Sequence, residues 1–336
     1  MNPSFSVITA LVAVIALVLV AMLGVDSIGL KYLFGVIVPY AAMVIFVVGV
    51  VWRILAWARV PVPVRIPTTC GQGKSLPWFK GAYFDSPWTT LGVIGRMAAE
   101  VLLFRSLFRN TKAEVHGGPR LAFTSAQWLW LGGILFHYSF LVIVVRHFRF
   151  FMEPVPSVVQ MISAVDSFFQ ILLPTVFLSD LAFLAAVTYL FLRRVAIPNM
   201  RYLSLPADYF PLFLILGIGI SGVLMRLFWK VDLLSIKNLT MGWVTLHPTV
   251  PEGIGTIFFV HLFLVSVLLA YIPFSKIMHL GGVFLSPTRN LANTNRMERY
   301  VNPWNYPVKV HTYEEYENEF REKMIEAGIP VEKEKP

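Results

Sequence analysis

The sequence predicts an all-α fold, a polytopic membrane bundle of six transmembrane helices. Only 14% of the 336 residues are charged and 57% are hydrophobic, whereas about 25% of a soluble domain is charged. Six apolar stretches approach or exceed the roughly 20 residues that cross a bilayer as a helix. They lie at about 4–24, 32–57, 123–147, 168–192, 209–229 and 254–278.

The net charge of +9 follows a membrane topology and does not indicate a nucleic-acid partner. Lysine and arginine concentrate in the links after the second and fourth stretches and in the tail after the sixth. By the positive-inside rule these regions are cytoplasmic, so both termini of a multi-pass protein of the cytoplasmic (inner) membrane would lie inside. The first stretch has no basic residue before it, which favours a retained helix over a signal peptide.

A single cysteine, Cys70, narrows the chemistry. It excludes an internal disulfide, a Cys-x-x-Cys-His haem attachment site and a cysteine-ligated iron–sulfur cluster in this chain. Any haem must therefore be non-covalent and held by other side chains.

Four histidines provide a ligand set for such a group. His137 and His147 are ten residues apart in the third stretch, and His261 and His279 are eighteen apart in or just after the sixth. Ionisable side chains at membrane depth are costly and mark functional sites. Because the two stretches run in opposite directions, the sequence predicts two haem b groups with bis-histidine ligation. His137 and His279 would hold the inner iron, and His147 and His261 the outer iron.

Helical geometry leaves an alternative open. Spacings of ten and eighteen residues correspond to axial separations of ~15 Å and ~27 Å, and Pro273 is a candidate for the kink that would absorb the mismatch. If the third span began at Phe123, His137 would be level with His261 and one haem would suffice. Interfacial Trp128 and Trp130 favour the later start and two haems. Any one histidine alone could equally be a packed residue.

The chain divides into three parts: an extra N-terminal helix (1–31), a core (32–280) with a long cytoplasmic loop (58–122), and a cytoplasmic tail (281–336). Within the loop, residues 88–108 predict an amphipathic helix that lies at the headgroups, against a partner, or packed under the bundle. In the tail, Thr312 and Glu315 form a capping box for a helix that ends near Gly328. This helix either docks a cytoplasmic subunit or packs against its own protein.

The histidine spacing resembles that of the haem-binding membrane subunit of respiratory nitrate reductase, the NarI family, across residues 32–280. The first helix is extra relative to the family's five-helix core. Within that superfamily the chain most resembles the DsrM-type cytochrome b subunits of DsrMKJOP complexes. The segments that carry this likeness are Leu135-Phe136-His137-Tyr138, Val145-Arg146-His147-Phe148-Arg149, Ser275-Lys276-Ile277-Met278-His279, 286–290, 302–305 and 308–313.

The resemblance implies an electron-transfer subunit of a quinone-linked oxidoreductase in sulfur metabolism, with no catalytic residue of its own. Menaquinone would be the membrane substrate, and a heterodisulfide-reductase-like iron–sulfur subunit of the DsrK type the cytoplasmic partner. A multihaem cytochrome c and further membrane and periplasmic subunits would complete the complex. We expect menaquinol oxidation at the outer side, with Glu153, Asp166 or His247 carrying protons outward.

The sequence departs from the nitrate reductase pattern at the quinone site. The family has a lysine there on the helix after the first histidine pair, whereas Asp166-Ser167-Phe168 offers none. Arg146 and Arg149, beside His147, are the nearest cations and candidates for binding haem propionates or quinone. A snorkelling role at the interface is the alternative for both.

Two rival functions remain compatible with the sequence. The first is a haem-free membrane anchor or transporter whose histidines shuttle protons or bind a metal, although the chain has no matched halves with interrupted helices. The second is a haem b subunit of another respiratory complex, for example a nitrate reductase, hydrogenase or formate dehydrogenase.

Overall fold

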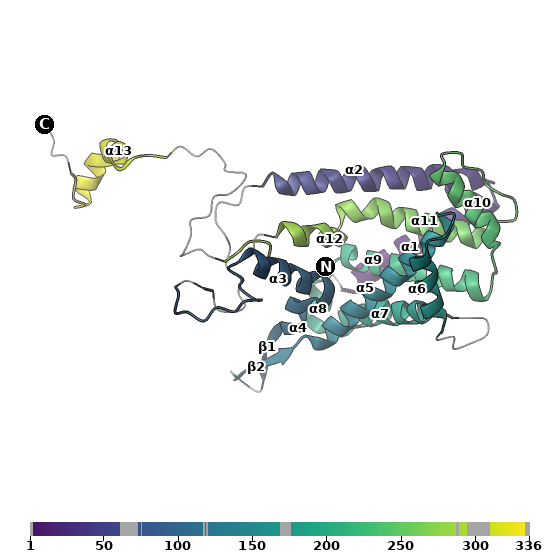
Figure 1. The fold of residues 1–336 in the computed structure, drawn as a ribbon, viewed down its shortest axis with the longest axis horizontal. Helices are drawn as coiled ribbons and strands as arrows, with labels where there is room; N and C mark the ends of the chain where they lie inside the picture. The colour runs from purple at the N-terminus through teal and green to yellow at the C-terminus, as the bar shows by residue number, and fades with distance from the viewer. Residues whose placement is uncertain are drawn as a thin grey trace.

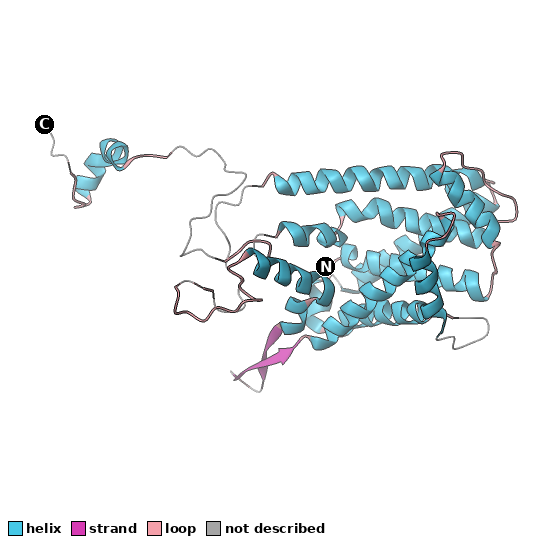
Figure 2. Ribbon diagram, in the orientation of Figure 1, coloured by secondary structure: helices cyan, strands magenta, loops and turns pink. Residues whose placement is uncertain are grey.

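The computed structural model describes residues 3–60, 73–74, 76–116, 118, 120–168, 176–286, 289–293 and 310–332. In this part of the chain, long helices run side by side in a bundle (Figure 1), and Figure 2 shows one small β hairpin beside them. The long helices are α1 (Pro3–Asp26), α2 (Val38–Ala58), α5 (Gln127–His147), α7 (Leu178–Ala196), α9 (Pro206–Leu227) and α11 (Thr256–Tyr271).

The long helices pack in a chain of neighbours. Helix α11 contacts three others, α1, α2 and α9. Helix α9 also contacts α1 and α7, and α7 in turn contacts α5. The densest core lies where α1, α9 and α11 meet, and it includes the fully buried Leu214 and Phe259. Within lipid the hydrophobic effect contributes little to the association of helices, so their stability depends more on close packing of one helix backbone against another. A Cβ on Gly132 of α5 would lie 2.6 Å from the Tyr189 ring of α7, so this pair of helices requires glycine there.

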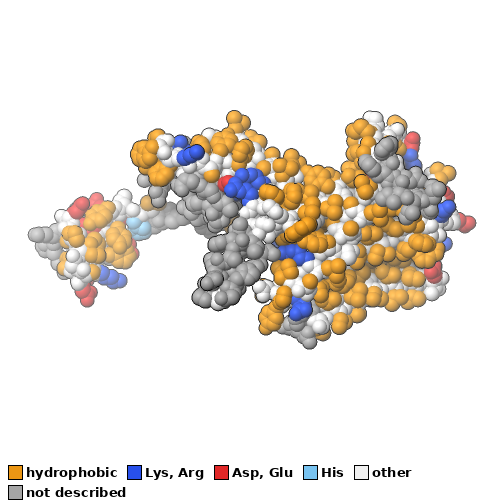
Figure 3. All heavy atoms as spheres, turned by 90° about the horizontal axis from the view of Figure 1, so that it is seen from below, with side chains coloured by type: hydrophobic (Ala, Val, Ile, Leu, Met, Phe, Trp, Pro, Cys, Tyr) orange, Lys and Arg blue, Asp and Glu red, His pale blue; other side chains and the backbone are white. Residues whose placement is uncertain are grey.

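The outer surface of the bundle is that of a membrane protein. Figure 3 shows hydrophobic side chains over most of the visible face of the bundle. Among the described residues, five helices are long and apolar enough to cross a bilayer: Ser4–Asp26, Leu33–Ala58, Gln127–Phe150, Pro206–Leu227 and Thr256–Phe274. The protein is therefore a multi-pass membrane protein with an all-α bundle.

The fourth expected span differs most from the prediction. We expected residues 168–192, but α7 begins at Leu178, and residues 169–175 lie outside the described chain. Asp180 in the first turn of α7, with Arg193 and Arg194 in the last, makes both ends polar, so α7 does not count among the five apolar spans. It nevertheless runs beside α5 and α9 like the other long helices.

Short elements gather at the two ends of the bundle (Figure 1). One end, here called the α3 end, carries α3 (Thr90–Leu103), α4 (Arg105–Arg109), the hairpin of β1 (Thr111–His116) and β2 (Arg120–Ser125), α8 (Pro198–Leu203), and α12 (His279–Gly282) with its flanking turn η5 (Val283–Leu285). The other, the α10 end, carries the π-helical turn η1 (Leu33–Ile37), η2 (Phe148–Phe150), α6 (Ser157–Phe168) and α10 (Leu233–Val244).

The amphipathic helix expected over residues 88–108 is present but broken in two. Phe104 adopts φ 49° between α3 and α4. Asp85 forms ion pairs with Arg105 and Arg109 of α4. Partial burial opposes ionisation of Asp85, but the two guanidinium groups outweigh it and hold the pKa of this carboxyl below its usual value. The loop and α4 are thereby joined.

The tail helix α13 (Tyr313–Glu326) confirms the prediction for this segment. Thr312 Oγ1 accepts a hydrogen bond from the backbone of Glu315, whose carboxylate accepts one from the Thr312 N–H in return. Gly328, with φ 70°, follows the end of the helix. In Figure 1 α13 lies apart from the bundle, beyond the α3 end.

Candidate haem-binding site

The four histidines come from three elements that the bundle holds together. His137 lies within α5 and His147 is its last residue, while His261 lies within α11. His279 opens the short helix α12. The third span begins at Gln127, and Phe123 belongs to β2. The early start that would have placed His137 level with His261 is therefore absent.

The chain between His261 and His279 is interrupted, as Pro273 predicted. Helix α11 ends at Tyr271 and is followed by two 3-10 turns, η3 (Ile272–Phe274) and η4 (Lys276–Met278). Proline has no N–H to continue the helical ladder. Ser275 between the turns is extended, with φ −115° and ψ 175°, and its side chain caps η4 by accepting from the Ile277 N–H at 3.1 Å. The segment that carries His279 can therefore leave the axis of α11.

This interruption brings His279 to His137. Their ring centroids are 6.0 Å apart and the ring planes cross at 82°. A metal ion held between two imidazole nitrogens at about 2.0–2.1 Å each, with about 1.1 Å from nitrogen to ring centre, would separate the centroids by about 6.3 Å. Phe104 and Phe136 each contact His137 edge-on at 4.9 Å. His137 and His279 thus have the separation expected of two imidazoles that share one metal ion.

His147 and His261 are the second predicted pair. They lie close enough to interact electrostatically. Gly222 of α9 lies against His261, because a Cβ there would be 3.5 Å from Cε1 of the imidazole. The structure brings His137 beside His279. Ligation of two haems in the antiparallel order, His137 with His279 and His147 with His261, stays a prediction.

All four imidazoles are oriented by a hydrogen bond at Nδ1. His137 donates to the Gly133 carbonyl oxygen at 2.7 Å, His147 to Ile143 at 2.7 Å, and His279 to Lys276 at 3.0 Å. A carbonyl oxygen can only accept, so Nδ1 carries the proton and Nε2 the lone pair. This is the arrangement that orients metal-binding histidines. No hydrogen bond in the described chain uses any of the four Nε2 atoms.

His261 differs, since its Nδ1 faces a side chain. Ser221 Oγ of α9 lies 2.9 Å from Nδ1 and donates its own proton to the Ile218 carbonyl at 3.0 Å. The hydroxyl therefore accepts from His261. Ser221 is buried, and it was not among the site residues predicted from the sequence. Its only signal was a serine next to glycine in an apolar span, which is common in membrane helices.

Arg146 and Arg149 have different surroundings. Arg146 is buried and paired with Asp166, and it donates to Ser179 Oγ at 2.8 Å and to Asp180 at 3.4 Å. Asp166 also accepts from the Ser179 N–H and hydroxyl. Arg149 lies over the Phe150 ring, with Cζ 4.7 Å from its centroid. Arg146 thus uses its donors within the protein.

Phe177 completes this buried cluster, because its ring lies between two guanidinium groups. Arg146 Cζ is 3.5 Å and Arg226 Cζ 3.7 Å from the ring centroid. The cluster joins the ends of α5, α6, α7 and α9. Such a network is costly to disrupt, since removing one partner of a buried ion pair leaves the other uncompensated.

The residues proposed to carry protons outward are separate from one another. Glu153 pairs with Lys237, and Asp166 belongs to the Arg146 cluster. His247 is exposed, and its Nδ1 donates to the Thr245 carbonyl at 2.7 Å. Of the histidines given no ligand role, His311 lies 3.7 Å from Glu319 in the tail and His116 ends β1.

Comparison with known proteins identifies the family. Residues 98–299 match the nitrate reductase gamma subunit family, and this range includes all four histidines. The chain belongs to this family. It is 50% identical over 279 residues to the Hdr-like menaquinol oxidoreductase cytochrome b-like subunit of Archaeoglobus fulgidus, covering 81% of this chain and 83% of that protein. The protein of the same description from Archaeoglobus profundus is 41% identical over 273 residues, covering 79% and 81%.

Proposed function

We propose that this protein is a membrane cytochrome b that holds two haem b groups, one between His137 and His279 and one between His147 and His261. The observation that carries the proposal is the 6.0 Å separation of the first pair, with both Nδ1 atoms anchored to carbonyl oxygens. A haem iron held between two histidines accepts and donates single electrons and keeps no open position for a substrate.

The residues of the chain contribute orientation and exclusion of water. The carbonyl and hydroxyl partners fix the tautomer that presents Nε2 and raise the basicity of each imidazole. Phe104 and Phe136 border His137 and keep that pair apolar. Low polarity around the histidines, together with the identity of the ligands, would set the potential of a bound haem.

The function we assign is electron transfer between the menaquinone pool and a cytoplasmic heterodisulfide-reductase-like iron–sulfur subunit, in sulfur metabolism. The Archaeoglobus relatives, described as subunits of an Hdr-like menaquinol oxidoreductase, support the quinone and the type of partner. A multihaem cytochrome c and other membrane and periplasmic subunits complete the proposed complex. The extra helix (1–31) and the tail (281–336) flank the dihaem core (32–280).

We assign the α3 end to the cytoplasm and the α10 end to the outer side of the cytoplasmic membrane. The concentration of lysine and arginine in the links at the α3 end supports this orientation, which places both termini inside. His147 then belongs to the outer haem, and menaquinol is oxidised on that side. Arg149 is the better candidate for binding a haem propionate, while Arg146 holds the surrounding helices in place.

The test is spectroscopic. Reduced-minus-oxidised absorption of the purified protein should show b-type bands, and a haemochrome assay should give two haems per chain. Replacing His147 or His261 by Ala should remove one and the same haem, and replacing His137 or His279 the other. Absence of b-type bands would support the haem-free anchor or transporter instead, and one haem per chain would refute the pairing. Subunits that co-purify distinguish this complex from another respiratory complex.

A further inference from the structure

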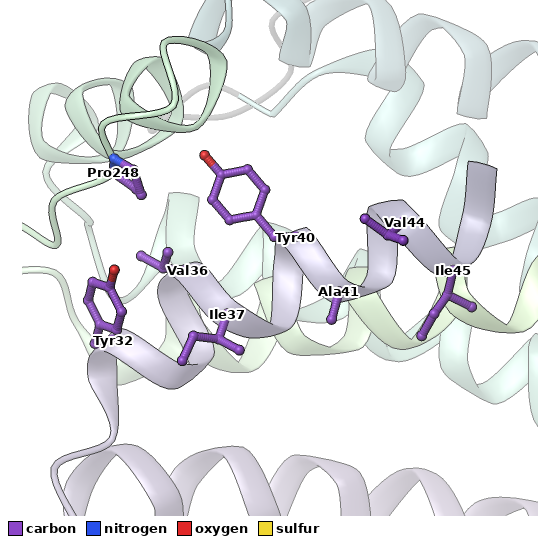
Figure 4. A pocket seen from close by; sticks show the side chains of 8 residues that line it. All are labelled: Tyr32, Val36, Ile37, Tyr40, Ala41, Val44, Ile45 and Pro248. Carbon is purple, nitrogen blue, oxygen red and sulfur yellow. The ribbon is translucent and has the colours of Figure 1, made fainter. Parts of the chain in front are cut away.

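A groove on the membrane-facing side of α2 lies near the α10 end of the bundle. We call it the α2 groove; its cavity volume is about 630 Å³ and it is lined by Tyr32, Val36, Ile37, Tyr40, Ala41, Val44, Ile45 and Pro248. Figure 4 shows Tyr32, Val36 and Tyr40 on the side of the helix that faces Pro248. Its volume is within the range of small-molecule sites, about 300–1,000 Å³.

The backbone around the α2 groove is irregular on both sides. The turn η1, Leu33–Ile37, is π-helical, and π-helical turns inside helices occur frequently at functional sites. On the facing loop, Leu246 has φ 61° although it is not glycine. A positive φ is uncommon for a bulky residue other than glycine, and such strained residues concentrate at functional sites such as ligand clamps. The π-helical turn therefore lines the groove with Val36 and Ile37, and the strained Leu246 lies two residues before Pro248.

The groove opens toward lipid and yet has polar groups. Ile37 is 51% and Val44 61% exposed on this apolar helix, so a ligand can enter from the bilayer. The Tyr40 hydroxyl donates to the Trp243 carbonyl at 3.0 Å and keeps lone pairs that can accept. The half-exposed Tyr32 has a hydroxyl for which the described residues provide no partner. A phospholipid acyl chain would need neither hydroxyl.

The inner wall of the groove packs directly on the helix that carries His261. Phe34 of η1 lies edge-on to Phe263 of α11 at 5.2 Å. A Cβ on Gly35 would be 3.1 Å from the Phe259 ring. Phe259 and Phe263 each lie two residues from His261, so the groove is separated from this histidine by about the thickness of α11, roughly 10 Å.

We infer that the α2 groove binds an isoprenoid quinol. The aromatic ring, with two hydroxyl groups, would lie between Tyr32 and Tyr40, and the isoprenoid tail would follow the apolar residues of α2 into the bilayer. This inference rests on the proposed function for the choice of quinol as the occupant. It assigns the quinol to the α2 side of α11, across that helix from α9 and Ser221.

The experiment uses the full chain in lipid nanodiscs and a photoreactive azido-menaquinone analogue, with labelled peptides mapped by mass spectrometry. Wild-type protein should be labelled within residues 32–45. Val44→Trp, which places an indole one turn from Tyr40, should reduce this labelling about tenfold or more, because the ring occupies the ligand's volume. Val48→Trp is the matched control, since Val48 is 62% exposed and does not line the groove; its labelling should equal that of the wild type. Tyr32→Phe should give an intermediate decrease.

Each outcome is decisive. Labelling near Arg149, or equal labelling of Val44→Trp and wild type, would overturn the inference. Labelling of residues 32–45 that excess phospholipid abolishes and unlabelled menaquinone does not would identify a lipid groove and also overturn it. The b-type absorbance of each variant is recorded separately, because its retention in Val44→Trp shows an intact fold. If the wild-type protein shows no b-type absorbance, the proposed function is refuted. If it shows this absorbance but no labelling within residues 32–45, only the quinol site in the α2 groove is refuted.

Discussion

Replacing Ser221 by Ala tests whether the Nδ1 partners of the histidines tune the proposed haems individually. Ser221 is the only one of the four partners described here that is a side chain, and it receives the His261 proton at 2.9 Å. An acceptor at Nδ1 makes the imidazole a stronger donor at Nε2 and favours ferric iron. The variant should therefore raise the midpoint potential of the outer haem and leave the inner one unchanged.

The expected size follows from the hydrogen bond. Its net value is about 0.5–1.5 kcal/mol. For a one-electron couple, 59 mV corresponds to about 1.4 kcal/mol. If the whole hydrogen-bond energy acted on one oxidation state, the midpoint potential would shift by about 20–60 mV, and a partial effect would shift it less. Alanine removes an acceptor from a buried N–H, which also predicts some loss of haem occupancy at that site.

Potentiometric titration followed by absorption and electron paramagnetic resonance resolves the two haems. Ser266→Ala is the matched control: Ser266 is a buried serine of α11 whose hydroxyl donates to the Leu262 carbonyl at 2.8 Å, and among the described hydrogen bonds it has none to a histidine. Ser221→Thr keeps the hydroxyl and should restore the wild-type potential. A shift below about 10 mV in Ser221→Ala, an equal shift in the Ser266 control, or a shift of the inner haem would refute the reasoning.

Three further predictions concern stability. Asp166→Ala should lower the free energy of unfolding by about 3–5 kcal/mol, because Arg146 loses its closest partner. The double variant that also carries Arg146→Leu should recover part of that loss. Thermal unfolding followed by circular dichroism measures both effects. Partial burial raises the pKa of Asp85, but Arg105 and Arg109 outweigh it and hold this pKa below its usual value. The stability that the ionised carboxylate contributes is therefore complete above the unfolded-state pKa and is lost as pH falls through the folded-state pKa. Hydrogen exchange of α4 should be constant from pH 5 to 8, after correction for the intrinsic rate, and accelerate below about pH 4. Thr312→Ala should cost α13 about 1 kcal/mol, measured by hydrogen exchange at Glu315.

The features predicted from the sequence are those determined by a few neighbouring residues or by the regular geometry of membrane-spanning helices. The capping box of Thr312 and Glu315 needs only four residues, and the spacing of the histidines on α5 depends only on helical rise. Pro273 identified the interruption after α11 for the same reason. The start of α7 was predicted about ten residues too early, because an apolar stretch does not mark where Asp180 begins a helix by pairing with Arg146.

The features that were missed depend on contacts between distant segments. Ser221 acts on His261, forty residues away, and no local pattern distinguishes it from Ser266. The cluster around Arg146 required knowledge of how α6, α7 and α9 meet. The hairpin of β1 and β2 belongs to a mostly polar loop, and its pairing of Thr111 with Ser125 was not anticipated because the surrounding helical signals dominate.

The connection after α11 accommodates the mismatch between the two histidine spacings. From His137 to His147, α5 rises ~15 Å, and the ten residues from His261 to Tyr271 give α11 the same rise. The eight residues from Ile272 to His279 would add ~12 Å to a straight helix. They form instead two short turns separated by an extended Ser275, and the histidine that follows them meets His137. The spacing of eighteen residues therefore consists of ten residues of helix, which match the rise of α5, and eight residues of connection. Pro273 ends the helix and so allows the connection to leave its axis.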